Sequence, residues 1–97
     1  MIRSFDHAAT EDVFNGLDTT FARRFAKDLW RSIRRKLTNL DAATSMADLA
    51  SVPGYRLEAL KGDQKGRYSI RVNDRYRITF RFEDGTPTTC DARTITN

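Results

Sequence analysis

The chain has few of the residues that build disulfide frameworks, metal sites or membrane spans. Its 97 residues include one cysteine and one histidine. Cys90 therefore has no partner for an intrachain disulfide, and no companion at the spacing of a metal site. No run of about 18 apolar residues occurs, and residues 1–6 lack the apolar stretch of a secretion signal. These absences predict a cytoplasmic protein with no membrane association, no metal and no cofactor.

Positive charge is what the sequence has in excess. Seventeen Lys and Arg residues oppose thirteen Asp and Glu residues, which gives a net charge of +4. The cations are concentrated in two stretches, residues 23–36 and residues 61–81. Clustered cations on a basic chain favour a polyanionic partner such as a nucleic acid.

Length and hydrophobic pattern predict one domain over residues 1–97. A hydrophobic content of 39% in a chain of this length is enough for one core. The apolar spacing changes from helical to strand periodicity after Pro53 and Gly54. We therefore predict an α+β fold, with N-terminal helices packed on one face of a small, mostly antiparallel, twisted β-sheet.

Two helices are expected before the sheet. Residues 8–15 are typical of a short helix, with Thr10 as the candidate N-cap. Apolar residues recur every three or four positions through residues 18–40, which predicts one long amphipathic helix with a basic outer face. Residues 42–52 are expected to form a loop with a helical turn at residues 46–49.

Several segments alternate apolar and polar residues as strands do, namely residues 2–5, 55–59, 67–72, 75–82 and 87–95. The register of the third and fourth segments can be derived. A two-residue turn at residues 73–74 would mix apolar and charged side chains on both faces of the hairpin. A three-residue loop at residues 73–75 instead pairs Ile70 with Ile78 and leaves one clean apolar face.

The opposite face of this hairpin then collects arginines. Arg71 lies beside Arg77, and Arg67 lies beside Arg81. Like charges directly across a strand pair destabilise the pair unless an anion lies between them. We therefore expect this face to bind phosphate, through arginine forks and neighbouring aromatic rings. The candidate RNA- or phosphate-binding residues are Arg67, Arg71, Arg75, Arg81, Lys65 and Tyr76.

Five blocks of the sequence resemble HigB toxins of the RelE/ParE toxin–antitoxin superfamily. The blocks are MIRSFDH (1–7), LEALKGDQKG (57–66), YSIRVN (68–73), YRITF (76–80) and FEDG (82–85). The resemblance implies a RelE-like fold and a type II toxin that inhibits translation as a ribosome-dependent mRNA endonuclease. It also implies a HigA-type helix-turn-helix antitoxin, the ribosome and mRNA as partners, and indirect binding to operator DNA through the antitoxin.

The resemblance also assigns catalytic positions. Lys61 and Arg77 match basic active-site positions, Glu58 stands where many relatives have histidine, and Tyr76 stands where tryptophan is more common. Metal-independent RNA cleavage needs a base for the ribose 2′-hydroxyl and cations for the phosphate. Glu58 is the candidate base, and Lys61 and Arg77 are the candidate cations. The alternative for Glu58 is a surface ion pair with Lys61 or Arg71.

The C-terminus departs from the family. Relatives usually end in an aspartate-tyrosine-histidine triplet, whereas this chain ends in RTITN (93–97). Without a gap, residues 94–96 replace the triplet; with one inserted residue, Asn97 takes the place of the aspartate. Thr96 and Asn97 are therefore tentative site positions. Two alternative functions stay open: a catalytically degenerate or truncated toxin that only binds its antitoxin, and a ParE-like inhibitor of DNA gyrase.

Three further features have structural interpretations. His7 is expected to form structural hydrogen bonds, and Cys90 is expected to pack in the core or at its edge. The basic face of the long helix is expected to be solvated, with contact to ribosomal RNA or an acidic antitoxin segment as the alternative.

Overall fold

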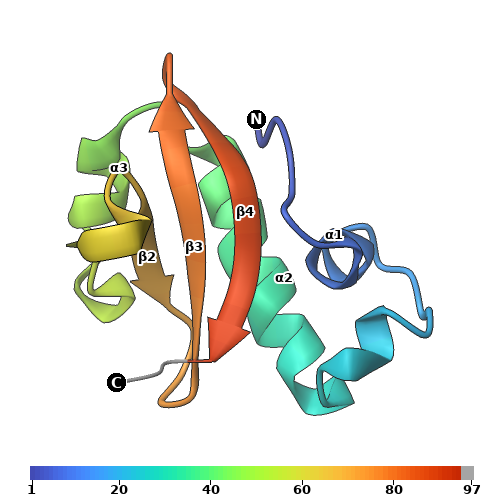
Figure 1. Cartoon of the computed structure of the whole chain (residues 1–97). Coiled ribbons are helices and arrows are strands. Elements are labelled where there is room, and N and C mark those ends of the chain that lie inside the picture. The colour runs from blue at the N-terminus through green and yellow to red at the C-terminus, as the bar shows by residue number, and fades with distance from the viewer. Residues whose placement is uncertain (95–97) are drawn as a thin grey trace.

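The computed structural model describes residues 1–94 (Figure 1). Its centre is a four-stranded antiparallel sheet in the order β1-β2-β3-β4. The strands are β1 (Glu58–Ala59), β2 (Tyr68–Arg71), β3 (Tyr76–Glu83) and β4 (Thr86–Thr94). The tentative positions Thr96 and Asn97, and the expected last residue of the final strand, lie outside the described residues.

Helices precede the sheet and cover one of its faces. The α-helices are α1 (Ala8–Phe14), α2 (Lys27–Ala42) and α3 (Met46–Ala50), and the short 3₁₀ helices are η1 (Ala22–Arg24), η2 (Pro53–Tyr55) and η3 (Gly62–Gln64). In Figure 1, α2 runs behind β3 and β4, and α1 lies beside the outer edge of β4. This arrangement confirms the predicted α+β fold.

The core lies between α2 and the sheet. It forms because one stripe of α2 and alternate residues of β2 and β3 are apolar. The side chains that meet there are fully buried: Ile33, Leu37, Leu40, Ile70, Ile78 and Phe80. Each contributes on the order of 1.5–3 kcal/mol by leaving water. The opposite face of the sheet, called here the open face, is the one that carries the polar side chains.

The predicted register of the β2–β3 hairpin is confirmed. Ile70 pairs with Ile78 and Arg71 pairs with Arg77. The Asn73 side chain closes the loop by accepting hydrogen bonds from the backbone N–H groups of Arg75 and Tyr76, both at 2.8 Å.

The predicted long helix is wrong, because the chain breaks it at Phe25. The segment forms η1, and Phe25 then adopts an extended conformation with φ −96° and ψ 141°. The Phe25 carbonyl keeps a hydrogen-bond partner despite this break, because it accepts a hydrogen bond from Trp30 Nε1 at 3.0 Å. Phe21 is 57% exposed, whereas Phe25 is buried. Only the later part of the apolar stripe, from residue 27 onward, therefore lies on α2.

The predicted cap of α1 is also wrong. His7 is the N-cap, and its Nδ1 accepts a hydrogen bond from the Ala9 N–H at 3.1 Å. Thr10 lies inside the helix, fully buried, and contacts β4 instead. The structural role expected for His7 is confirmed, whereas Thr10 belongs to a long-range contact that no local pattern indicates.

Two predicted strands are much shorter than expected. Residues 2–5 form a single parallel bridge, between Phe5 and Cys90, although the segment follows β4 through further backbone hydrogen bonds. The segment predicted at residues 55–59 is a strand only at Glu58–Ala59, because Arg56 turns the chain with φ 47°.

Candidate active site

The open face of the sheet carries two cross-strand rows of polar side chains. Cross-strand partners share a face, so the register assigns the members of each row. The first row contains Glu58, Ser69, Thr79 and Asp91, and the second contains Arg71, Arg77 and Arg93. A carboxylate therefore stands at each end of the first row, beside a row of three arginines.

A small cavity of about 90 Å³ lies where these rows meet β1. Its lining residues are Arg56, Glu58, Ser69, Arg71 and Arg77. The volume corresponds to about three water molecules, which suits a group of phosphate size and is too small for a nucleobase. The cavity thus brings together the predicted base, Glu58, and the predicted cation, Arg77. Three guanidinium groups facing one such space favour an anion.

Two of these arginines have little electrostatic compensation. Arg71 Nη1 lies 3.7 Å from Asp74 Oδ1, but the Asp74 side chain is fully exposed, and such surface pairs contribute little. Arg77 Nε is buried and has no acceptor among residues 1–94. A buried charged donor without an acceptor costs roughly 1–3 kcal/mol or more. An anion bound in the cavity would remove that cost.

Glu58 forms no ion pair within residues 1–94, so the pairing with Lys61 or Arg71 that offered an alternative role is not found there. Its backbone is fixed by pairing with Ser69. Arg56 is a lining residue that sequence reasoning missed. It was assigned to a regular strand, and only its left-handed backbone, which reverses the direction of the chain, brings it to the cavity.

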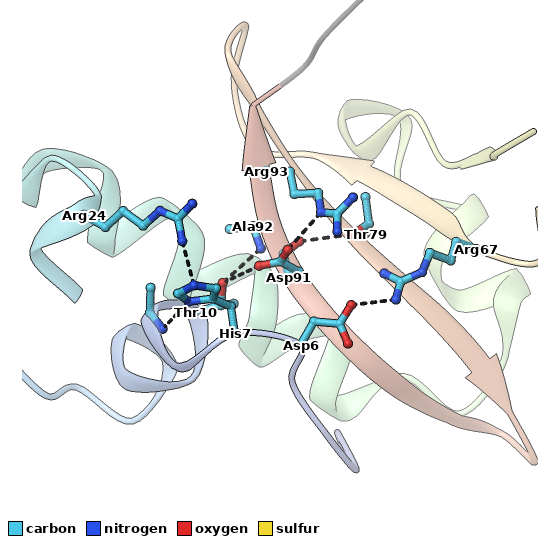
Figure 2. Close-up of polar contacts among 10 residues, drawn as sticks. Asp6, His7, Thr10, Arg24, Arg67, Thr79, Asp91, Ala92 and Arg93 are labelled. Carbon is cyan, nitrogen blue, oxygen red and sulfur yellow. Dashed lines mark hydrogen bonds and ion pairs between the residues drawn. The ribbon is translucent and has the colours of Figure 1, made fainter. Parts of the chain in front are cut away.

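Arg67 and Arg81 lie elsewhere on the open face. Arg67 Nη2 is 2.6 Å from Asp6 Oδ2, and the two side chains are 12% and 32% exposed (Figure 2). A carboxylate of the same chain thus already binds the guanidinium that was expected to bind phosphate. The Arg81 guanidinium lies against Gly66, where an added Cβ would approach its Nη1 to 2.9 Å.

The remaining candidates do not line the cavity. Lys61 immediately precedes η3, Lys65 immediately follows it, and both are exposed. Arg75 is exposed in the β2–β3 loop. Tyr76 packs edge to face against Phe25, with ring centroids 5.9 Å apart, and lies at the border of the core.

A polar network at β4 is a second feature that the sequence did not reveal. Asp91 accepts hydrogen bonds from Thr10 Oγ1 at 3.1 Å and from Arg93 Nε at 2.9 Å (Figure 2). Thr10 Oγ1 also accepts from the Ala92 N–H at 3.0 Å. The network ties α1 to the edge of the sheet and fixes the Asp91 carboxylate beside the arginine row.

The cysteine is excluded as a nucleophile. Cys90 is fully buried, and burial, followed by the nearby charge of Asp6, raises the pKa of its thiol to about 12. A neutral buried thiol is unreactive. The expected core position of Cys90 is therefore confirmed.

Metal clusters and membrane-spanning helices are both absent from the described part of the chain. No group of three or more His, Cys, Asp or Glu side chains within residues 1–94 is arranged to hold a metal ion. None of the helices in that range combines the length and apolar character needed to cross a bilayer.

The chain is similar to known proteins of one family. The sequence profile of the RelE-like toxin HigB of type II toxin–antitoxin systems matches residues 3–90. Toxin HigB-1 of Vibrio cholerae is 44% identical over 63 residues, which are 65% of this chain and 66% of that protein. Endoribonuclease HigB of Proteus vulgaris is 38% identical over 85 residues, 88% of each chain.

A solved structure shows the same fold at lower sequence similarity. The YoeB–YefM complex of Staphylococcus aureus contains a chain that superimposes with a TM-score of 0.56 and 17% identity, covering 94% of this chain and 95% of that one. The family profile spans nearly all of the described residues, including β1, β2 and β3, which carry the cavity. The chain therefore belongs to the HigB-like family, the RelE-like toxins of type II toxin–antitoxin systems.

Proposed function

We propose that this toxin is an endoribonuclease that cuts mRNA on the ribosome, and that the cavity between β1, β2 and β3 holds the phosphate of the cleaved bond. The observation that carries the proposal is the pairing of Arg71 with Arg77 beside Glu58, with the buried Arg77 Nε short of an acceptor within residues 1–94. The name of the Proteus vulgaris relative, Endoribonuclease HigB, supports the same activity.

The proposed reaction is an internal transfer that needs no metal. Glu58 removes the proton of a ribose 2′-hydroxyl, and the resulting oxyanion attacks the adjacent phosphorus. The bond from phosphorus to the 5′-oxygen of the next nucleotide breaks, and that oxygen takes a proton from Lys61. The products are a 2′,3′-cyclic phosphate and a 5′-hydroxyl end. General base and acid catalysis of this kind contributes about 10²–10⁴-fold to the rate.

Arginines carry the electrostatic part of the reaction. Arg77, Arg71 and Arg56 face the same small space, so their guanidinium groups can bind the non-bridging oxygens as negative charge grows on them. Arg77 has the strongest claim, because burial of its Nε removes competing water. Lys65, which is exposed directly after η3, would contact a phosphate that follows.

The partners of the proposed enzyme follow from its family. We expect a HigA-type helix-turn-helix antitoxin, through which the complex binds operator DNA, and a cytoplasmic site of action on ribosomes and mRNA. Membership of a toxin–antitoxin family and the similarity to a chain of the YoeB–YefM complex support an antitoxin partner in general. The second candidate function is a toxin that binds its antitoxin without cutting RNA. It is favoured by one observation, the absence of the family's tyrosine and histidine from RTITN (93–97).

Induced expression in bacteria followed by mapping of mRNA 5′ ends tests the activity. We expect growth arrest and new 5′ ends within translated messages for the natural sequence. Arg77→Ala should abolish both, and Arg23→Ala, whose side chain is paired with Asp18 on the exposed surface of η1, should abolish neither. Growth arrest with DNA damage and without new ends would support gyrase inhibition, and the absence of all these effects would support the binding-only function.

A further inference from the structure

A second and larger pocket lies at the end of the arginine row. It has a volume of about 520 Å³ and fills the space between η1 and the outer edge of β4. The polar groups that line it come from His7, Arg24, Tyr76, Asp91, Arg93 and Thr94. Ligand pockets of small molecules fall in the range of about 300–1,000 Å³, so this pocket can accept a nucleobase with its ribose.

The pocket continues the candidate active site. Arg93, in its lining, is the cross-strand partner of Arg77, which lines the small cavity. Directly opposite residues on adjacent strands lie about 5 Å apart. Cations therefore follow one another from Arg71 through Arg77 and Arg93 to Arg24 on η1. Phe25 and Tyr76 supply aromatic rings beside these cations. A continuous row of cations beside aromatic rings is the usual arrangement of sites that bind single-stranded nucleic acid.

Arg24 is not fully satisfied by its neighbours. Its Nη1 lies 2.7 Å from His7 Nε2, while the other ring nitrogen of His7 faces the Ala9 N–H (Figure 2). A neutral imidazole has only one acceptor nitrogen, so it cannot accept from both donors. Within residues 1–94 no carboxylate lies within 4.0 Å of the Arg24 guanidinium. The guanidinium is thus free to bind a phosphate.

The edge of β4 adds hydrogen-bonding groups to the pocket. Residues 90 and 92 direct their backbone groups away from β3, toward the N-terminal segment and Thr10. The same alternation directs the N–H and C=O of Thr94 outward, into the pocket that Thr94 lines. The Asp91 carboxylate accepts from Thr10 and Arg93 and retains further lone pairs. It can accept from the amino group of a base.

We propose that this pocket binds the nucleotide one position beyond the two that the cleaved phosphate joins, with Arg24 and Arg93 on its phosphate and Asp91 on its base. The assignment rests on the proposed ribonuclease function and extends it to substrate selection. Adenine, guanine and cytosine carry an exocyclic amino group that can donate to Asp91, whereas uracil has none. The pocket is therefore expected to disfavour uridine.

Short RNAs that cannot be cut separate this proposal from the proposed activity. The probes are 2′-O-methyl ApA, ApApA and UpUpU, which lack the nucleophilic hydroxyl. Binding is measured by titration calorimetry and by NMR shifts of backbone amides in the full chain. We expect ApApA to bind about five- to tenfold more tightly than ApA and than UpUpU, with shifts at Ala92 and Thr94.

Arg24 and Arg23 give a matched pair of variants on the same short helix. Arg24→Ala should remove the advantage of ApApA and leave the affinity for ApA unchanged, whereas Arg23→Ala should retain the advantage. Equal ApApA binding by wild type and Arg24→Ala would overturn the pocket assignment. So would a loss of antitoxin binding in Arg24→Ala with unchanged RNA binding, or the absence of any RNA binding. Failure of the active-site assignment looks different, because ApA binding would then survive Arg77→Ala.

Discussion

The Arg67 guanidinium is bound by the Asp6 carboxylate of the N-terminal segment, 61 residues earlier in the chain, at 2.6 Å. The contact crosses the open face, and Arg67 is only 12% exposed there. Asp6 therefore fastens the N-terminal segment to the sheet, and it also neutralises one of the several arginines on the open face.

Removing the Asp6 charge should destabilise the protein. Asp6→Asn leaves the largely buried Arg67 without its counter-ion, which is expected to cost about 1–3 kcal/mol of unfolding free energy. Urea denaturation followed by circular dichroism measures this. Asp18→Asn is the control, because Asp18 pairs with Arg23 on the exposed surface and its loss should leave the urea midpoint unchanged. Equal midpoints for all three proteins would contradict the proposed role of Asp6.

The Thr10 hydroxyl should contribute more to the free energy of unfolding than the Thr10 methyl group does. Thr10→Val keeps the shape but removes the acceptor of the buried Ala92 N–H and the donor to Asp91, at a cost of about 1–3 kcal/mol. Thr10→Ser keeps both hydrogen bonds and should retain slow amide hydrogen exchange at Ala92. Fast exchange in Thr10→Ser but not in Thr10→Val would show that the hydroxyl does not carry this contact.

Cys90 should make the protein less stable in alkali. Burial raises the pKa of the folded-state thiol to about 12 from 9.0, so above pH 9 the unfolded state loses a proton that the folded state keeps. Stability from this group is complete below pH 9 and falls by about 1.4 kcal/mol per pH unit above it. Cys90→Ala should remove that part of the slope in denaturation measured between pH 8.5 and about 10.5. Parallel slopes for the two proteins would contradict it.

The contribution of Arg77 to the cleavage rate should depend on the shape of its side chain as well as on its charge. Arg77→Ala is expected to lower the cleavage rate on translating ribosomes by about 10²–10³-fold, since it removes a donor to the transition state. Arg77→Lys keeps the charge but loses the planar fork, and it should give an intermediate rate. Primer extension on a defined mRNA provides the rates, with Arg23→Ala as the control. A wild-type rate in Arg77→Ala would remove this residue from the mechanism.

The cleavage rate of Glu58→Gln tests whether Glu58 is the base. Glu58→Gln should lower the rate by about 10²–10⁴-fold if the carboxylate is the base. The loss should be much smaller if the ribosome or the RNA itself supplies the base. In both cases the affinity for 2′-O-methyl ApA should stay near that of the natural sequence, because glutamine preserves the size of the side chain.

The part of the site that depends on local pairing could be predicted from the sequence. The parity of β2 and β3 placed Arg71 beside Arg77, because a three-residue loop keeps Ile70 and Ile78 on one face and a two-residue turn does not. Arg67 was misassigned, although its parity was also correct. Its partner, Asp6, arrives from a distant segment that carries no periodicity linking it to the sheet.

The residues that β4 contributes to the site could not be predicted from the sequence, for a different reason. Its pairing with β3 shifts register between Thr79 and Arg81, and Thr89 adopts a positive φ of 51° within the strand. A register extrapolated from one end of the strand is therefore wrong at the other. Asp91 and Arg93 could be aligned with the arginine row only after this irregularity was seen.

The hydrogen bond between Thr10 and Ala92, two residues separated by 82 positions, also constrains the order in which the elements of the fold can form. α1 precedes the sheet in the sequence but packs against β4, at residues 86–94, so it cannot dock until β4 has formed. Contacts of such long range fold slowly. The docking of α1 is therefore expected to be a late step in the folding of this chain.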